Sequence, residues 1–174
     1  MAASPDNPNL VPEWKVAGII DWLMDEGRTI KDVSRLTAEL GERLNLAGMP
    51  ILRLRVGLRT IHPLVVGNIY TWWRDQPEVE TFRPPHGIMD SSDYVGSPIE
   101  SVHRTGKPFR CRLQQTGPAQ LHSTLRSLRD VGASDYLALP LNFTFDELPT
   151  PIIVVTDRPQ GFSDHDIRQF ERLT

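Results

Sequence analysis

The stretch 132-GASDYLALPLNF-143 decides the fold. It opens with a glycine turn and then runs through apolar residues that are typical of a strand inside a sheet. Asp135 and Tyr136 mark the expected entry to this strand, and the Tyr136 hydroxyl either contacts a ligand in an apolar cleft or forms its own hydrogen bonds on a loop. Because a proline cannot donate to a strand ladder, we expect Pro140 at a bulge or where the strand edges a pocket. The sequence therefore predicts a central strand over 136–143 beside a small cavity.

Five further strands are expected on either side of it along the chain. The clearest is 51-ILRLRVGLRTI-61, in which apolar residues alternate with arginines and therefore face opposite sides of a sheet. Prolines in the connections suit hairpins, and consecutive hairpins require an antiparallel sheet. The other expected strands cover 65–73, 78–83, 109–113 and 152–156.

Apolar periodicity and capping residues predict helices between the strands. The best-marked helix follows Ser97, because Pro98 takes the first helical position and Glu100 stands where a capping box closes. We expect an α+β fold in which helices flank a six-stranded antiparallel sheet and the N- and C-terminal helices pack together. The expected helices cover 13–26, 29–46 with Thr29 as N-cap, 97–106, 118–132, and 163–174 with a box of Ser163 and Asp166.

Composition bounds the class of protein. The 174 residues fit one domain, and a net charge of −3 does not indicate a nucleic-acid partner. Cys111 is the single cysteine, so no intrachain disulfide is possible and a reducing compartment is expected. No apolar segment is long enough to cross a bilayer, and the start lacks a signal-peptide pattern. We expect a cytoplasmic protein with no membrane contact, consisting of a flexible lead-in over 1–12 and a domain over 13–174.

Sequence motifs of catalysis are missing. There is no glycine-rich phosphate loop, no G-x-S-x-G and no H-E-x-x-H, and the five histidines are scattered. The acidic pair around His165 suits the first turn of a helix better than a metal site. Alternation on its strand places Cys111 in the core, so we expect an unreactive thiol there. The sequence predicts no metal site and no catalytic residue.

An arginine stripe leaves two alternatives open. Arg53, Arg55 and Arg59 share one face of the expected strand 51–61. Such a face is either solvated or covered by a partner, with carboxylates bridging the charges, or it binds an anion, because the guanidinium fork matches carboxylates and phosphates.

Several blocks together resemble the amino-terminal GAF-like domain of bacterial class III adenylate/guanylate cyclases, as found in alphaproteobacterial multidomain proteins. The resemblance covers nearly all of residues 13–174, and its most specific parts are R-T-I-H-P-L and G-A-S-D-Y-L-A-L-P-L-N-F. The blocks are 19-IIDWL-23, 40-LGERLNLAGMP-50, 58-LRTIHPLVVGNIYTWWR-74, 85-PHGIMDSSDYVGSP-98, 132-GASDYLALPLNF-143 and 161-GFSDHDIRQFERL-173.

This resemblance implies a regulatory module that makes no cyclic nucleotide itself and precedes a cyclase catalytic domain. It also implies a pocket on one face of the sheet and a homodimer through the terminal helices. No cofactor follows from it, and a small-molecule ligand is possible but unidentified. The candidate pocket residues are His62, Trp72, Ser97, Arg110 and Tyr136. The candidate dimer contacts are Trp14, Ile19, Trp22, Leu23, Phe170 and Leu173.

Two other functions remain open at this stage. The domain could be an architectural module that holds two chains in register without a ligand, and a cleft filled by its own side chains would favour this. It could also be a free-standing redox enzyme of the same fold, such as a methionine sulfoxide reductase. That chemistry normally needs an attacking and a resolving cysteine, and the chain has one.

Overall fold

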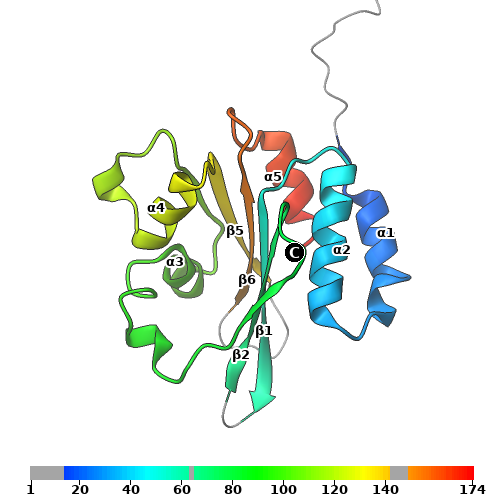
Figure 1. Ribbon diagram of the computed structural model, residues 1–174, viewed down its shortest axis with the longest axis horizontal. Coiled ribbons are helices and arrows are strands. Elements are labelled where there is room, and N and C mark those ends of the chain that lie inside the picture. The colour runs from blue at the N-terminus through cyan, green and yellow to red at the C-terminus, as the bar shows by residue number, and fades with distance from the viewer. Residues whose placement is uncertain (1–13, 63–64, 142–148) are drawn as a thin grey trace, which may run out of the picture.

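A computed structural model describes residues 14–62, 65–141 and 149–174 (Figure 1). Within these ranges six strands form one antiparallel sheet in the order β3-β2-β1-β6-β5-β4. The predicted α+β fold with a six-stranded antiparallel sheet is therefore confirmed. The strands are β1 (Arg53–His62), β2 (Val65–Trp73), β3 (Glu80–Phe82), β4 (Phe109–Arg112), β5 (Asp135–Leu141) and β6 (Thr150–Thr156).

Helices cover both faces of the sheet and make three layers (Figure 1). One face carries α1 (Ala17–Met24), α2 (Val33–Leu46) and α5 (Asp164–Glu171). The opposite face carries α3 (Pro98–Thr105) and α4 (Ser123–Asp130). Short 3₁₀ turns lie in the connections at Gly27–Thr29, Ile88–Asp90 and Pro118–Gln120.

Strand alternation divides the core into two clusters. On β5, Leu137 and Leu139 pack into the cluster below α1, α2 and α5, whereas Tyr136 and Ala138 pack into the cluster below α3 and α4. Successive side chains of a strand point to opposite faces, so one buried strand supplies both cores. This double burial explains why the sequence of β5 is apolar at successive positions.

Pro140 lies opposite Pro151 of β6, and the register between the two strands continues past them without a shift. The two residues that lack an N–H therefore fall at one point of the ladder. On the other side of β5 the pairing with β4 reaches only Ala138, which pairs with Phe109. Pro140 is thus accommodated beyond the end of its neighbour, without a bulge.

The expected N-cap of the second helix is wrong. Thr29 ends a 3₁₀ turn, and its hydroxyl donates to the carbonyl oxygen of Glu26 at 2.7 Å. Asp32 caps α2 instead, and its Oδ1 accepts from the backbone N–H of Ser34 at 2.9 Å. Thr29 and Asp32 are three residues apart, and each has a short polar side chain that can hydrogen-bond to nearby backbone, so either could have served as the N-cap.

The helix expected from Pro118 begins later. Pro118–Gln120 is a 3₁₀ turn, and Leu121 after it has an extended backbone, with φ −85° and ψ 132°. α4 then starts after His122, whose Nδ1 accepts from the backbone N–H of Thr124 at 3.3 Å. The proline favours a helical first turn, but the extended residue ends it.

The chain segment before α1 packs on α5 and joins the two ends of the described chain. The capping box of Ser163 and Asp166 is confirmed. Asp166 also accepts a hydrogen bond from the indole N–H of Trp14 at 2.7 Å and from the guanidinium of Arg158. Burial alone raises the pKa of Asp166, but hydrogen bonds from Ser163, Trp14 and Arg158 outweigh it and lower that pKa. The Trp14 and Phe170 rings lie 5.1 Å apart in the same contact.

Candidate ligand-binding pocket

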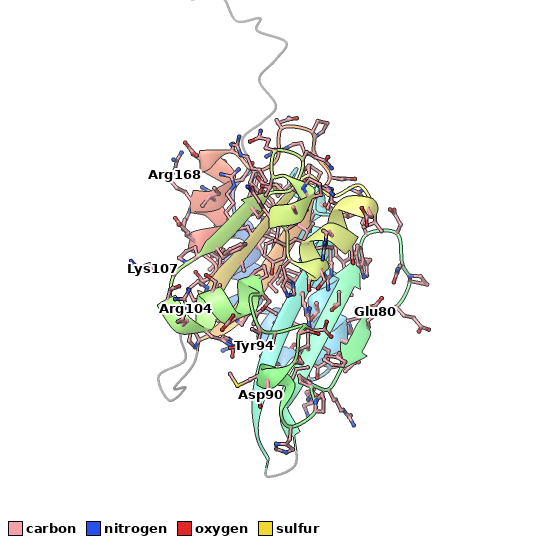
Figure 2. All side chains as sticks on the ribbon, turned by 90° about the vertical axis from the view of Figure 1, so that its left-hand side faces the viewer. Glu80, Asp90, Tyr94, Arg104, Lys107 and Arg168 are labelled. Atoms are coloured by element: carbon pink, nitrogen blue, oxygen red, sulfur yellow. The ribbon has the colours of Figure 1, made fainter. Side chains whose placement is uncertain are left out.

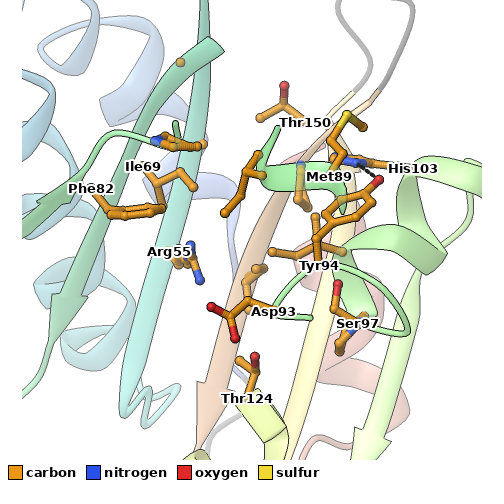
Figure 3. Close-up of a pocket in the computed structure, with 18 of the residues that line it drawn as sticks. Arg55, Ile69, Phe82, Met89, Asp93, Tyr94, Ser97, His103, Thr124 and Thr150 are labelled. Carbon is orange, nitrogen blue, oxygen red and sulfur yellow. Dashed lines mark hydrogen bonds between the residues drawn. The ribbon is translucent and has the colours of Figure 1, made fainter. Parts of the chain in front are cut away.

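A cavity of about 360 Å³ lies on the α3 and α4 side of the sheet (Figure 3). Its floor is formed by β1, β2 and β6, and the loop of residues 83–97 and the start of α3 cover it. Its volume falls at the lower end of the range of small-molecule sites. The apolar lining residues are Leu58, Ile69, Phe82, Pro84, Ile88, Met89, Pro98, Ile99, Pro151 and Ile153, and the polar ones include Arg53, Arg55, Asn68, Asp93, Tyr94, Ser97, His103, Thr124, Tyr136 and Thr150.

Two arginines of β1 enter the cavity from its floor. Arg53 and Arg55 are two residues apart and therefore share the face of the sheet that carries the pocket. The guanidinium of Arg53 lies over the ring of Trp73, with its Cζ 5.0 Å from the ring centroid. Figure 3 shows Arg55 directed from β1 into the pocket, across from Asp93. The arginine alternation visible in the sequence thus supplies the positive charge of this site.

Neither arginine has a carboxylate in salt-bridge contact among the described residues. Burial lowers the pKa of Arg53 to about 10, and the neighbouring charge of Arg55 adds to this effect. Burial also lowers the pKa of Arg55. The Nε of Arg53 is buried and has no hydrogen-bond partner in the described structure. Two cations therefore share a poorly solvated site without a bound counter-charge.

The loop of residues 83–97 is tied to the helices beside it. The Tyr94 hydroxyl lies 2.9 Å from Nδ1 of His103 on α3, as the dashed line in Figure 3 shows. Two residues before Tyr94, the carbonyl oxygen of Ser92 lies 3.2 Å from Nε2 of His122. Figure 2 looks onto this side of the molecule and shows Tyr94 in front of the sheet. These contacts hold the loop over the cavity.

Ser97 and Tyr136, two of the candidate pocket residues, line the cavity. Ser97 caps α3, and its Oγ accepts from the backbone N–H of Glu100 at 3.2 Å. The Glu100 carboxylate bonds to Gly96 rather than closing a box on Ser97. Tyr136 is 2 % exposed, and burial raises the pKa of its hydroxyl.

Trp72 lies outside the pocket lining, contrary to expectation. In the register of β1 and β2 it pairs with Leu54, so it faces α2 on the other side of the sheet. Its ring lies against Gly41, where the Cβ of any larger residue would be 2.5 Å from the ring. Trp72 is therefore a packing residue between sheet and helix, and it is Trp73 that faces the pocket side.

Arg110 also lies outside the lining. Its Nη2 is 2.7 Å from Oδ2 of Asp135, which is fully buried, and it also donates to the carbonyl oxygen of Phe162. The Phe162 N–H in turn donates to Asp135 at 3.0 Å. These hydrogen bonds connect the turn before α5 to the start of β5. The charged start of β5 therefore has a structural role.

The side chain of His62, at the end of β1, lies outside the described part of the chain, as does that of Arg59. Cys111 is partly exposed, not buried as expected, and its Sγ lies 3.6 Å from the Thr116 hydroxyl. It is not among the lining residues of the pocket.

Most candidate dimer contacts are buried within the protomer. Trp14, Ile19, Trp22 and Phe170 are between 1 % and 7 % exposed because they fill the core below α1, α2 and α5. They are not available to a second chain in this conformation. Leu23 and Leu173 are half-buried against the same core. The exposed apolar side chains of this region are Met24 and Leu46.

Sequence patterns did not reveal the pocket residues of the loop. Asp93, Tyr94 and Met89 follow no periodicity, and His103 lies on a helix whose apolar face gave no hint of a site. The one sequence feature that could have indicated these pocket residues is the position of their loop between an edge strand and a strongly capped helix. In the described residues no group of three His, Cys, Asp or Glu side chains could hold a metal ion. No helix of the described chain is long and apolar enough to cross a bilayer.

Comparison with known proteins identifies the fold. No protein-family model matches the chain, and no curated protein matches it either. Solved GAF domains match its structure with probability 1.00. The GAF domain of a phosphoenolpyruvate-protein phosphotransferase from Coxiella burnetii has a TM-score of 0.59 at 13 % identity and covers 91 % of this chain and 88 % of its own.

Two further structures agree. The phycocyanobilin-bound GAF domain of a cyanobacterial phytochrome has a TM-score of 0.58 at 11 % identity, covering 90 % of this chain and 88 % of its own. The GAF domain region of a Geobacter sulfurreducens PCA protein has a TM-score of 0.54 at 10 % identity, covering 90 % and 92 %. The chain therefore has the GAF fold over nearly its whole length.

Proposed function

We propose that this chain is a regulatory domain that senses a small molecule in the pocket between the sheet and the loop of residues 83–97. The observation that carries the proposal is the cavity of about 360 Å³ with Arg53 and Arg55 in its floor. Two half-buried cations that lack a carboxylate partner are not expected in a purely architectural module, because partly desolvating such charges lowers its stability. A ligand-binding role accounts for both the space and the charge.

The proposal extends to the output of the full protein. The sequence blocks quoted above resemble the regulatory region of class III nucleotide cyclases, so we assign control of a cyclase catalytic domain in the cytoplasm to this domain. The domain itself carries out no chemistry in this proposal. A redox enzyme is disfavoured because Cys111, the one cysteine, is outside the pocket lining. Ligand binding would act by biasing two arrangements of the chain.

Filling the pocket is expected to abolish ligand-induced stabilisation. Ile69 lies in the floor on β2 (Figure 3), and Ile69→Trp places a larger ring in the cavity. A ligand at about 100 times its Kd stabilises a wild-type domain of this size by roughly 5–10 °C in Tm, and the variant should show no such shift. The measurement is thermal unfolding against a panel of charged and neutral metabolites.

Val131→Trp is the matched control, since Val131 is exposed at the end of α4 and does not line the pocket. It should keep the full ligand-induced shift. A compound that stabilises wild type and Ile69→Trp equally binds elsewhere and counts against the pocket. If no compound stabilises the wild type, the architectural function is favoured instead.

We also propose a homodimer through the helical layer that contains the terminal helices α1 and α5, with the exposed Met24 of α1 and Leu46 of the neighbouring α2 as contacts in place of the buried residues. Light scattering at micromolar concentration should give twice the mass of the 19.7 kDa chain. Met24→Glu is expected to shift it to the monomer, because a buried charge at an interface costs several kcal/mol. A monomeric wild type would refute this part of the proposal and leave the sensing site unaffected.

A further inference from the structure

We propose that the ligand of this pocket is a small organic anion, with a carboxylate or phosphate head bound by Arg53 and Arg55 and a compact apolar body. This inference rests on the proposed sensing function and adds the chemical class of the ligand. It depends on three features of the described residues: the charge of the floor, the free hydrogen-bonding capacity of the arginines, and the apolar walls.

The charge of the lining is unbalanced. Arg53 and Arg55 contribute two positive charges, and Asp93 is the one carboxylate among the lining residues. Asp93 is exposed, belongs to the covering loop and forms no salt bridge with either arginine. Glu80 on β3 interacts with both arginines only at longer range. An anion in the cavity would neutralise two cations that otherwise repel each other.

The guanidinium groups of the two arginines also carry hydrogen-bond donors that a ligand could use. The guanidinium of Arg53 is held over the Trp73 ring, with its Cζ 5.0 Å from the ring centroid, and its buried Nε has no hydrogen-bond partner among the described residues. Tyr136 lies near both charges, and its hydroxyl is protonated because burial raises its pKa. A planar fork held in place suits bidentate binding of a carboxylate or phosphate.

The walls restrict the rest of the ligand. Side chains from β2, β3, the loop and α3 make the remaining lining mainly hydrocarbon: Ile69, Phe82, Ile88, Met89 and Ile99. Hydroxyl groups placed against them would lose hydrogen bonds to water without replacement. The wall chemistry therefore favours a largely apolar or aromatic body, with polar groups only where the unpartnered oxygens of Asn68 and Thr150 can bind them, and the volume favours a compact one.

Isothermal titration calorimetry tests the proposed anion specificity by comparing the affinity of organic acids with that of their neutral counterparts. The probe pairs are phenylacetate with phenylacetamide and hexanoate with hexanamide, and phenyl phosphate distinguishes the two head groups. Wild type should bind at least one acid about 10–100-fold more tightly than its amide, the range for a charge-assisted hydrogen-bond pair. Arg55→Gln should reduce this preference to less than about threefold. Arg112→Gln, which removes an exposed arginine of β4 outside the pocket, should keep it.

The outcomes separate the ligand class from the sensing function. Equal binding of acid and amide, abolished by Ile69→Trp, would overturn the anion inference and leave the sensing pocket in place. Failure of every acid to bind would also overturn the inference, and failure of the neutral probes and metabolites as well would remove the sensing function with it. The comparison of acid with amide uses wild-type protein, so it does not depend on the folding of a variant. A higher Tm for ligand-free Arg55→Gln than for wild type would support the inference, since one of two repelling charges is gone.

Discussion

Trp72→Ala is expected to lower the free energy of unfolding by about 3–5 kcal/mol, the usual cost of removing a buried tryptophan ring. The ring is 4 % exposed and fills the space between β2 and α2. Its loss leaves a void that a glycine at position 41 cannot fill. Urea unfolding followed by far-ultraviolet circular dichroism measures the change. Ligand affinity of the folded variant should stay within about threefold of wild type, because Trp72 faces away from the pocket.

Gly41, which lies against the Trp72 ring, provides the control. Gly41→Ala should destabilise the wild type by about 1–3 kcal/mol, because its Cβ would lie 2.5 Å from the Trp72 ring and the helix would have to move away. In the Trp72→Ala background the same substitution should cost nothing, since the ring is gone. A double-mutant cycle detects this non-additivity. Additive effects would show that the cost of Gly41→Ala does not come from the Trp72 ring. A Trp72→Ala protein of normal stability that has lost its ligand would show that Trp72 serves the pocket instead.

Asp135→Asn is expected to cost about 3 kcal/mol and to lower Tm by roughly 6–12 °C. The substitution keeps the shape of the side chain but removes the charge that faces Arg110 at 2.7 Å. The side chain of Arg110 is 24 % exposed, so water recovers part of the loss and the lower end of the range for buried pairs applies. Thermal unfolding at neutral pH measures the effect.

Asp130→Asn is the matched control, because Asp130 is exposed at the end of α4, and the Tm of this variant should change by no more than about 2 °C.

Gly161→Ala should disturb the hydrogen bonds of Asp135 from another side. Gly161 has φ +70°, and a Cβ there would lie 2.5 Å from the Asp135 carboxylate. A normal Tm for Asp135→Asn would mean that the network of Asp135, Arg110 and Phe162 contributes little to stability.

Much of the fold was predictable because it depends on local patterns. Strict alternation identified β1, and the cap at Ser97 with Pro98 after it identified α3. The strand over 136–143 was expected from its apolar run, and its described part is β5, Asp135–Leu141. Periods of two and 3.6 residues and capping chemistry act over a few residues, so one sequence suffices to detect them.

The site was less accessible to sequence analysis because it depends on which face of the sheet each residue takes. Trp72 and Trp73 are adjacent and chemically alike, yet one packs on α2 and the other lies below Arg53 on the pocket side. Arg110 resembles the arginines of β1 in its pattern, but it pairs with Leu137 across the ladder and its guanidinium reaches the buried Asp135 diagonally. Nothing within a strand tells which helix will cover which side, so these assignments required the tertiary structure.

The alternation of β1 has a mechanical consequence. Arg53 and Arg55 reach into the cavity, while Leu54 between them is completely buried beneath the layer of α1, α2 and α5. A displacement of the two guanidinium groups would therefore act on the backbone that carries Leu54. If the proposed anion binds, we therefore expect its effect to reach the helical layer through the backbone of β1, because Leu54 is the direct chain neighbour of both arginines.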